Sequence, residues 1–168
     1  MVILGIDPGL AITGYGLVEE RGSEYSRVAS GCIRTSRDTA PALRLEEIFE
    51  SVRGVIERYQ PAAMAVEKLF FCKNVRTALQ VGEARGTIIL AAAKNNVALF
   101  EYTPLQVKQA VAGYGNAGKM QVQNMVQLLL RLPERPPVDD EADALAIALC
   151  HLQHRRYHEA VEGSRRGD

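Results

Sequence analysis

The chain has 168 residues, of which 47% are hydrophobic and 24% charged, as in an ordinary globular protein with a buried core. It carries 20 basic and 20 acidic residues, so the overall charge gives no reason to expect nucleic acid as a partner. No apolar run approaches the length of a membrane span, and the three cysteines have no metal-ligand spacing. We therefore expect one domain over residues 1–157, a polar and flexible tail over 158–168, reduced thiols and a cytoplasmic location.

The hydrophobic pattern predicts strands first and then helices that alternate with strands. The strands are expected in a hairpin over 2–18 and in segments 25–35, 62–67 and 97–102. The helices are expected in segments 41–59, 74–95 and 104–112, around 122–129, and from 139 onward. This order indicates an α/β fold, in which a mixed central β-sheet is flanked by α-helices.

Charge is distributed unevenly along the chain. Residues 68–119 contain seven basic and two acidic residues, whereas the segments on either side have a net negative charge. A basic middle third is compatible with a surface that faces phosphates, but it also describes ordinary solvated charge. The pattern by itself does not choose between the two interpretations.

The first hairpin places one carboxylate, Asp7, at the end of an apolar strand. Pro8 and Gly9 predict a tight turn, and the Gly-rich return strand leaves little side-chain bulk nearby. We interpret this as room for a metal ion or a phosphate, and as clearance for a DNA strand if the site is a nuclease. Because Asp is also a common turn residue, the hairpin alone fits a purely structural role equally well.

Three further acids decide between these readings of Asp7. Glu67 ends a second buried strand, and Asp140 and Asp143 lie three residues apart on one face of the last helix. Acids at a helix N-terminus are common as caps, an explanation that covers residues 139–141 better than Asp143. Carboxylate oxygens suit Mg²⁺ or Mn²⁺, and two such ions roughly 4 Å apart can clamp the reacting oxygens of a phosphodiester. The four acids therefore fit metal-dependent phosphodiester hydrolysis.

Five segments together resemble the RuvC family of Holliday-junction resolvases. They are Gly5–Gly9, Val66–Phe70, Tyr102–Lys108, Gly118–Gln123 and Asp140–Ala146, which follow the family's order over roughly residues 1–155. The resemblance implies a ribonuclease H-like fold and a homodimeric endonuclease that nicks four-way DNA junctions symmetrically during recombination and repair. It also implies cooperation with a branch-migration complex of RuvA and RuvB.

The resemblance also implies roles for individual residues. The catalytic, metal-binding acids, expected to hold two Mg²⁺ or Mn²⁺ ions, are Asp7, Glu67, Asp140 and Asp143. Asp139 stays an alternative to Asp140, because it also shares a helix face with Asp143. The DNA-binding residues are Phe70, which would stack on an unpaired base, and Lys108 and Lys119, near the scissile phosphate. The helix that contains Gly82 and Gly86 would form the dimer, and close packing would explain glycine there.

Other functions fit parts of the sequence. The hairpin around Asp7 also resembles the phosphate loop of actin-like ATPases and sugar kinases, but those need a second domain and an adenosine site. A junction-binding protein without catalysis would have little reason to keep four acids. Gly113–Lys119 resembles a P-loop, but it follows a helix and lacks the Ser or Thr that Met120 replaces. His151 lies about 16 Å along the helix from Asp140, too far for the same metal.

Overall fold

The computed structural model describes the backbone of residues 1–68 and 75–165 and the side chains of 1–68 and 77–157. The strands are β1 (Val2–Asp7), β2 (Ile12–Arg21), β3 (Glu24–Arg34), β4 (Ala63–Glu67) and β5 (Ala98–Tyr102). The helices are α1 (Pro41–Tyr59), α2 (Val75–Lys94), α3 (Pro104–Ala112), α4 (Lys119–Leu129) and α5 (Asp139–Arg165). Within the described residues, none of the helices has the length and apolar character needed to cross a membrane.

The five strands form one mixed sheet in the order β3-β2-β1-β4-β5. The first three strands form the expected antiparallel meander, whereas β4 and β5 run parallel to β1. Because β1 is the central strand, its carboxyl end lies between the end of β4 and the hairpin that leads into β2. The predicted α/β class with a mixed central sheet is confirmed.

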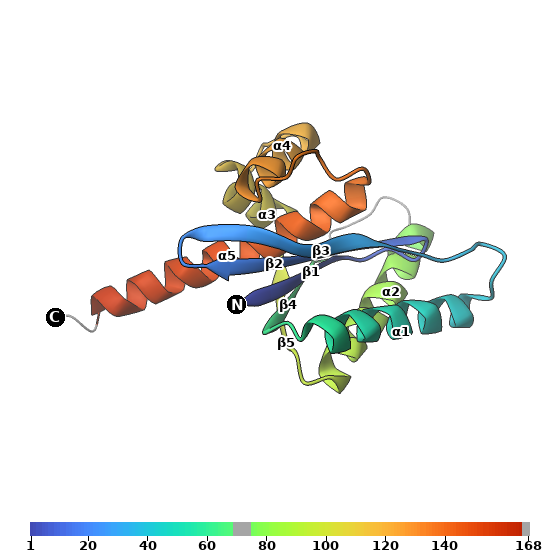
Figure 1. The fold of residues 1–168 in the computed structure, drawn as a ribbon. Coiled ribbons are helices and arrows are strands. Elements are labelled where there is room, and N and C mark those ends of the chain that lie inside the picture. The colour runs from blue at the N-terminus through green and yellow to red at the C-terminus, as the bar shows by residue number, and fades with distance from the viewer. Residues whose placement is uncertain (69–74, 166–168) are drawn as a thin grey trace.

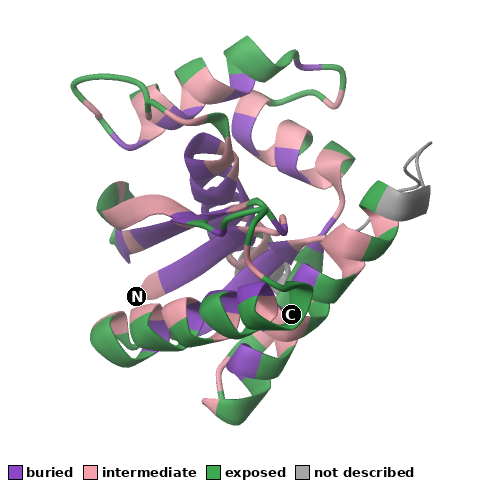
Figure 2. Cartoon of the chain, turned by 90° about the vertical axis from the view of Figure 1, so that its right-hand side faces the viewer, coloured by how far each residue is buried: buried purple, intermediate pink, exposed green. Residues whose placement is uncertain are grey.

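Helices cover both faces of the sheet (Figure 1). One apolar cluster joins α1 and α2 to one face, and a second joins α3, α4 and α5 to the other. The buried residues lie in the strands and on the inner sides of the helices (Figure 2). Burial of these two apolar layers holds the strand ends, and with them the predicted site, in fixed positions.

The glycines of the first hairpin allow α5 to pack closely on the sheet. A Cβ atom on Gly14 would lie 1.9 Å from the carbonyl oxygen of Asp140, and one on Gly5 would lie 2.1 Å from that of Ala144. Our interpretation of the glycines as clearance for DNA is therefore wrong. The space that they leave is filled by the backbone of α5, and a side chain there would push this helix away from Asp7.

The last helix is longer than expected. Its backbone is helical through Arg165, past the boundary at residue 157 where we expect a tail. Hydrogen bonds within a helix can extend it beyond the last residue that packs on the core, which a change in composition does not reveal. The described cysteines, Cys32 and Cys150, are free thiols, as expected.

Candidate active site

Two parallel strands bring the first pair of acids together. Residue Ile6 of β1 lies opposite Val66 of β4 in the parallel register, so Asp7 and Glu67 end neighbouring strands at the same edge of the sheet. Both strands are short, apolar and buried up to the carboxylate. The sequence pattern of an apolar strand that ends in an acid therefore produces a side-by-side pair.

The first turn of α5 brings the second pair of acids to this edge. Asp7 pairs with Gly14 across the hairpin, and the backbone of Asp140 lies directly against Gly14. Asp143 follows one turn later and faces the same pocket as Glu67. The convergence of the four acids, which the spacing of the sequence could not establish, is thus a property of the fold.

The crowding of negative charge is strongest at Asp7. Burial, and after it the repulsion from three other acids, raises the pKa of Asp7 from 3.8 to about 8. In order of effect these acids are Glu67, Asp143 and Asp140. Burial also raises the pKa of Glu67 and of Asp143. A group of acids that disfavour one another's ionised form is an environment that a bound cation would relieve.

The structure distinguishes Asp139 from Asp140. Asp139 is exposed, and it accepts a hydrogen bond of 2.7 Å from the side-chain amide of Gln123. That bond and the ammonium group of Lys119 lower its pKa. Asp139 and Asp140 each raise the pKa of Asp143. Only Asp140 of the two is among the groups that raise the pKa of Asp7. The geometry therefore favours Asp140 as the third acid.

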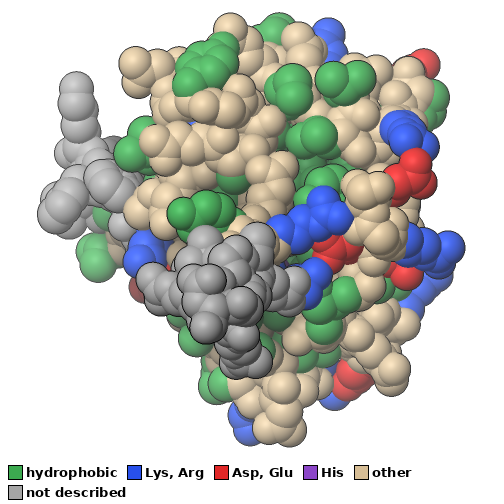
Figure 3. Space-filling view, turned by 90° about the vertical axis from the view of Figure 1, so that its left-hand side faces the viewer, with side chains coloured by type: hydrophobic (Ala, Val, Ile, Leu, Met, Phe, Trp, Pro, Cys, Tyr) green, Lys and Arg blue, Asp and Glu red, His purple; other side chains and the backbone are tan. Residues whose placement is uncertain are grey.

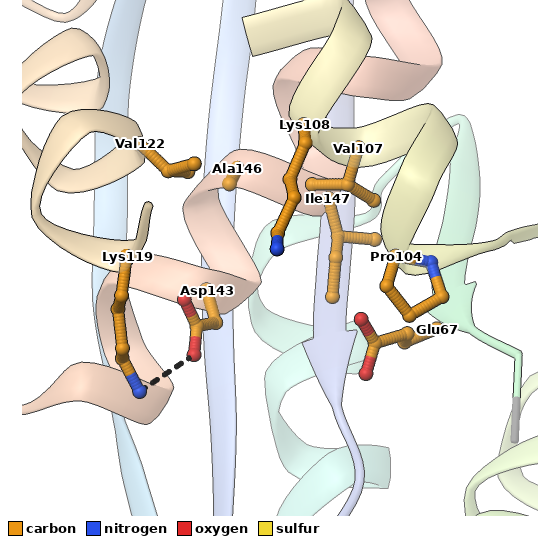
Figure 4. A pocket seen from close by; sticks show the side chains of 9 residues that line it. All are labelled: Glu67, Pro104, Val107, Lys108, Lys119, Val122, Asp143, Ala146 and Ile147. Carbon is orange, nitrogen blue, oxygen red and sulfur yellow. Dashed lines mark ion pairs between the residues drawn. The ribbon is translucent and has the colours of Figure 1, made fainter. Parts of the chain in front are cut away.

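Two lysines face the acids across a pocket of about 210 Å³ (Figure 4). The ammonium group of Lys119, at the start of α4, lies 3.3 Å from Asp143 and 3.1 Å from Asp139. Lys108 enters from α3, and its charge lowers the pKa of Glu67 against the larger effect of burial. Both lysines therefore line the same pocket as Glu67 and Asp143, and their predicted contact with the scissile phosphate stays a prediction.

Hydrogen bonds at the start of α3 aim Lys108 into this pocket. The side chain of Thr103 accepts a hydrogen bond of 3.2 Å from the backbone amide of Gln106. The side chain of Gln106 accepts one of 2.9 Å from the backbone amide of Thr103. These two hydrogen bonds form a capping box, with Pro104 in the first helical position. It fixes where α3 begins, and Lys108 follows one turn later.

The donors at the site suit a hard divalent cation. Among the described residues, no three His, Cys, Asp or Glu side chains are gathered closely enough to hold a metal ion as they stand. The available donors are nevertheless carboxylate oxygens, which Mg²⁺ and Mn²⁺ prefer.

Three other predicted features have different outcomes. Phe70 lies outside the described residues, so its predicted role stays a prediction. His151 is buried and shares a hydrogen bond of 2.8 Å with the hydroxyl of Tyr102. Burial lowers the pKa of His151 to about 4, and its 5% exposure makes it a core residue. The loop that resembles a P-loop follows α3, as expected, and has no strand before it.

The sequence did not reveal the residues that hold the turn after Asp7. The hydroxyl of Thr13 donates to the carbonyl of Gly9 at 2.6 Å, and that of Thr35 donates to the carbonyl of Leu10 at 2.5 Å. Arg44, buried in α1, donates to Thr35 at 2.8 Å. The sequence did contain one signal for this role of Arg44. It lies four residues before Ile48, on the same helical face as the apolar residues of α1.

Glu141 is a second residue that the sequence did not reveal. We expect it to be one of the acids that cap the helix, but it is buried against β3 and accepts a hydrogen bond from Ser30. It lies four residues before Leu145 and seven before Ala148, both fully buried. Helical periodicity therefore places Glu141 on the inner face of α5. Because Glu141 is acidic and lies in the first turn, a helix cap was the simpler interpretation.

Comparison with known proteins identifies the family. A family model described as "Crossover junction endodeoxyribonuclease RuvC" matches residues 3–151. A protein of this name from Pelotomaculum thermopropionicum is 56% identical over 154 residues, 92% of this chain and 94% of its own. One from Desulforamulus reducens is 57% identical over 153 residues, 91% of this chain and 94% of its own.

A solved structure confirms the fold. Thermus thermophilus RuvC, in complex with a Holliday junction substrate, superposes with a TM-score of 0.91 at 39% identity and covers 94% of this chain and 96% of its own. This similarity confirms the ribonuclease H-like fold of the mixed sheet and its helices. With the family model matching most of the sequence and relatives more than half identical to it, the chain belongs to the RuvC family of crossover junction endodeoxyribonucleases.

Proposed function

We propose that this protein is a Holliday-junction resolvase, a metal-dependent endodeoxyribonuclease that nicks four-way DNA junctions symmetrically during homologous recombination and repair. The observation that carries the proposal is the convergence of acids from β1, β4 and α5, of which Glu67 and Asp143 line a pocket that also contains two lysines. The Thermus thermophilus relative, described in complex with a Holliday junction substrate, supports the same substrate for this chain.

The acids hold the divalent cations in this proposal. Asp7 and Glu67 supply ligands from the sheet, and Asp140 and Asp143 supply them from α5. Two Mg²⁺ ions, or Mn²⁺ in their place, would provide the Lewis acidity that activates water and stabilises the departing oxygen. The raised pKa of Asp7 supports this assignment, because its burial and the neighbouring acids outweigh the charge of Lys119, and a divalent cation would stabilise the ionised carboxylate.

The lysines bind the DNA strand. Lys119 pairs with Asp143 in this structure, and a cation between the acids would release its ammonium group for the scissile phosphate. Lys108 would meet the same phosphate from α3 and neutralise charge that develops during hydrolysis. Phe70 would stack on a junction base, as the family resemblance implies, at a contribution of about 1–3 kcal/mol.

A second copy of the chain would pack on α2. Leu79 and Leu90 are 64% and 50% exposed, and Gly86 lies between them on the same helical face. Among the described residues, no atom lies within 4 Å of a Cβ placed on Gly86, which leaves room there for the close packing of a second copy. A two-fold dimer would present two pockets to two strands of the junction. RuvA and RuvB would be its partners, in the cytoplasm.

Purified protein incubated with a synthetic four-way junction tests the proposal. We expect nicks in two opposing strands in Mg²⁺, none in EDTA, and none in a linear duplex of the same sequence. Binding of the junction without nicks in either Mg²⁺ or Mn²⁺ would favour a binding protein without catalysis. Hydrolysis of ATP without nicks would instead favour the phosphate loop of an actin-like ATPase.

A further inference from the structure

The first turn of α5 is tied to the edge strand β3 through Glu141. The hydroxyl of Ser30 donates a hydrogen bond of 2.6 Å to the Glu141 carboxylate, and the guanidinium of Arg27 lies 4.0 Å from the same oxygen. The Glu141 side chain is only 10% exposed, so these contacts are largely shielded from water. They join residues more than a hundred positions apart in the sequence.

An irregularity in β3 makes both contacts feasible. Gly16 and Leu17 of β2 pair with Ser30 and Ala29, but Val18 pairs with Arg27, so Val28 is an extra residue. In a regular strand, positions 27 and 30 would point to opposite faces of the sheet. The bulge reverses this alternation and brings Arg27 to the face on which Ser30 and α5 lie. Two groups that bind the Glu141 carboxylate therefore stand side by side.

Glu141 lies between two acids of the site, directly after Asp140 and two residues before Asp143. An α-helix is stiff over one turn, so a displacement of Glu141 moves both acids relative to Asp7. Displacements of about 1 Å at a reacting centre can reduce rates on the order of 100-fold. The contact between Glu141 and β3 therefore bears on the distances from the Asp140 and Asp143 carboxylates to the Asp7 carboxylate.

We propose that Glu141 is a positioning residue of the active site, which, held by Ser30 and Arg27, sets the Asp140 and Asp143 carboxylates against Asp7. Glu141 makes no contact with substrate or metal in this role. The effect on cleavage rests on the proposed nuclease function, whereas the effect on cation binding does not.

A purely structural role for Glu141 is the alternative, and α5 offers a matched control. Glu20 of β2 is also a buried carboxylate, 6% exposed, that ties the sheet to a later turn of α5 through Arg155 and Arg156. Loss of either carboxylate removes a buried link between the sheet and the helix. Only the loss of Glu141 should change the geometry of the site.

Cation affinity gives a readout that is independent of cleavage. Binding of Mn²⁺ to the DNA-free protein can be followed by the electron paramagnetic resonance signal of the free ion. We expect Glu141→Ala to weaken Mn²⁺ binding about 10-fold and to raise the Mg²⁺ concentration for half-maximal nicking by a similar factor. Glu141→Gln, which keeps an acceptor for Ser30, should stay within about threefold of the wild type.

Two further variants complete the experiment. Ser30→Ala should weaken Mn²⁺ binding about threefold in the wild type and have no added effect in Glu141→Ala, because both act through one contact. Glu20→Ala should leave Mn²⁺ affinity within about twofold of the wild type. The Ser30→Ala and Glu141→Gln variants keep the test decisive if Glu141→Ala fails to fold.

Unchanged Mn²⁺ affinity in Glu141→Ala would overturn the proposal, as would an equal loss in Glu20→Ala, or a wild-type protein that binds no Mn²⁺. If the wild type binds Mn²⁺ but does not nick a junction, the proposed function fails. The Mn²⁺ titrations would still decide the role of Glu141.

Discussion

The part of α5 that packs on the sheet, residues 139–156, carries charged side chains at both of its ends, here called the near end (residues 139–143) and the far end (residues 155–156). At the far end, the Glu20 carboxylate is paired with Arg155 and Arg156, and the Arg156 Nε atom lies 2.6 Å from it. Basic and acidic side chains lie next to one another on this face of the molecule (Figure 3). At the near end, burial and the repulsion of neighbouring acids raise the pKa of Asp7 to about 8, although Lys119 pairs with Asp139 and Asp143. The far end has its charges matched, whereas at the near end the acids outnumber the basic groups that face them.

The middle of α5 is apolar, and its burial offsets the repulsion between the acids at the near end. Leu145, Leu149 and Leu152 are completely buried between the two ends. Each fully buried leucine stabilises the fold by about 2 kcal/mol, an upper estimate because the unfolded chain is partly compact. Packing and the matched far end can therefore hold α5 in place while its first turn carries acids that repel one another.

The largest effect is expected at the near end. Asp7→Asn should reduce nicking of a four-way junction by at least about 10³-fold, because a neutral amide is a poor ligand for a divalent cation and several kcal/mol of stabilisation would be lost. Gel assays of junction cleavage in Mg²⁺ measure this, and junction binding in Ca²⁺ should stay within about twofold. Cleavage at a normal rate would contradict the assignment of Asp7 as a metal ligand.

A change at the far end should alter stability and not catalysis. Glu20→Ala should lower the free energy of unfolding by about 2 kcal/mol, since Arg155 and Arg156 lose their shared partner but are exposed enough to regain water. Urea unfolding measures the change. Glu24→Ala is the control, because its pair with Arg131 is 62% and 74% exposed and should contribute less than about 1 kcal/mol. Equal losses would show that burial of the Glu20 pair has no consequence.

The near end should also make stability depend on pH. The folded pKa of Asp7, about 8, lies above the ordinary 3.8, so its protonated form stabilises the fold fully below about pH 4. That contribution is lost as the pH rises towards 8. Without divalent cations, Asp7→Asn should therefore gain stability over the wild type between pH 4 and 8, reaching at least about 1 kcal/mol, or 2–4 °C in Tm.

Thermal unfolding in EDTA across this pH range measures the difference between the two proteins. Addition of Mg²⁺ should reduce it, because the cation stabilises the ionised carboxylate of the wild type alone. A constant difference in Tm from pH 4 to 8 would contradict the raised pKa.

The smallest effect distinguishes two neighbouring acids. Asp139→Asn should change the nicking rate less than about threefold, because Asp139 is exposed and its contacts are with Gln123 and Lys119 at the surface. Asp140→Asn, at the position that faces the hairpin, should reduce the rate at least about 100-fold. Single-turnover rates on the same junction compare them, and the reverse order would move the third ligand to Asp139.

The sequence by itself predicted the elements and most of the site because these depend on local chemistry. Apolar segments that end in Asp7 and Glu67 are short strands in any fold, and Thr103 caps α3 through residues next to it. The three-residue spacing of Asp140 and Asp143 puts them on one helix face regardless of what the helix packs on. Resemblance to a family then supplied the expectation that these acids meet.

Only the tertiary structure decided which distant groups approach one another. It showed that Gly14 makes room for the backbone of α5 and not for DNA, because the clash partner, Asp140, is far away in the sequence. It distinguished Asp139 from Asp140 by their surroundings. It also placed Glu141 against Ser30, beside a β-bulge that the sequence of β3 does not predict. Periodicity states which face a residue is on, but the partner on that face is set by how the chain packs.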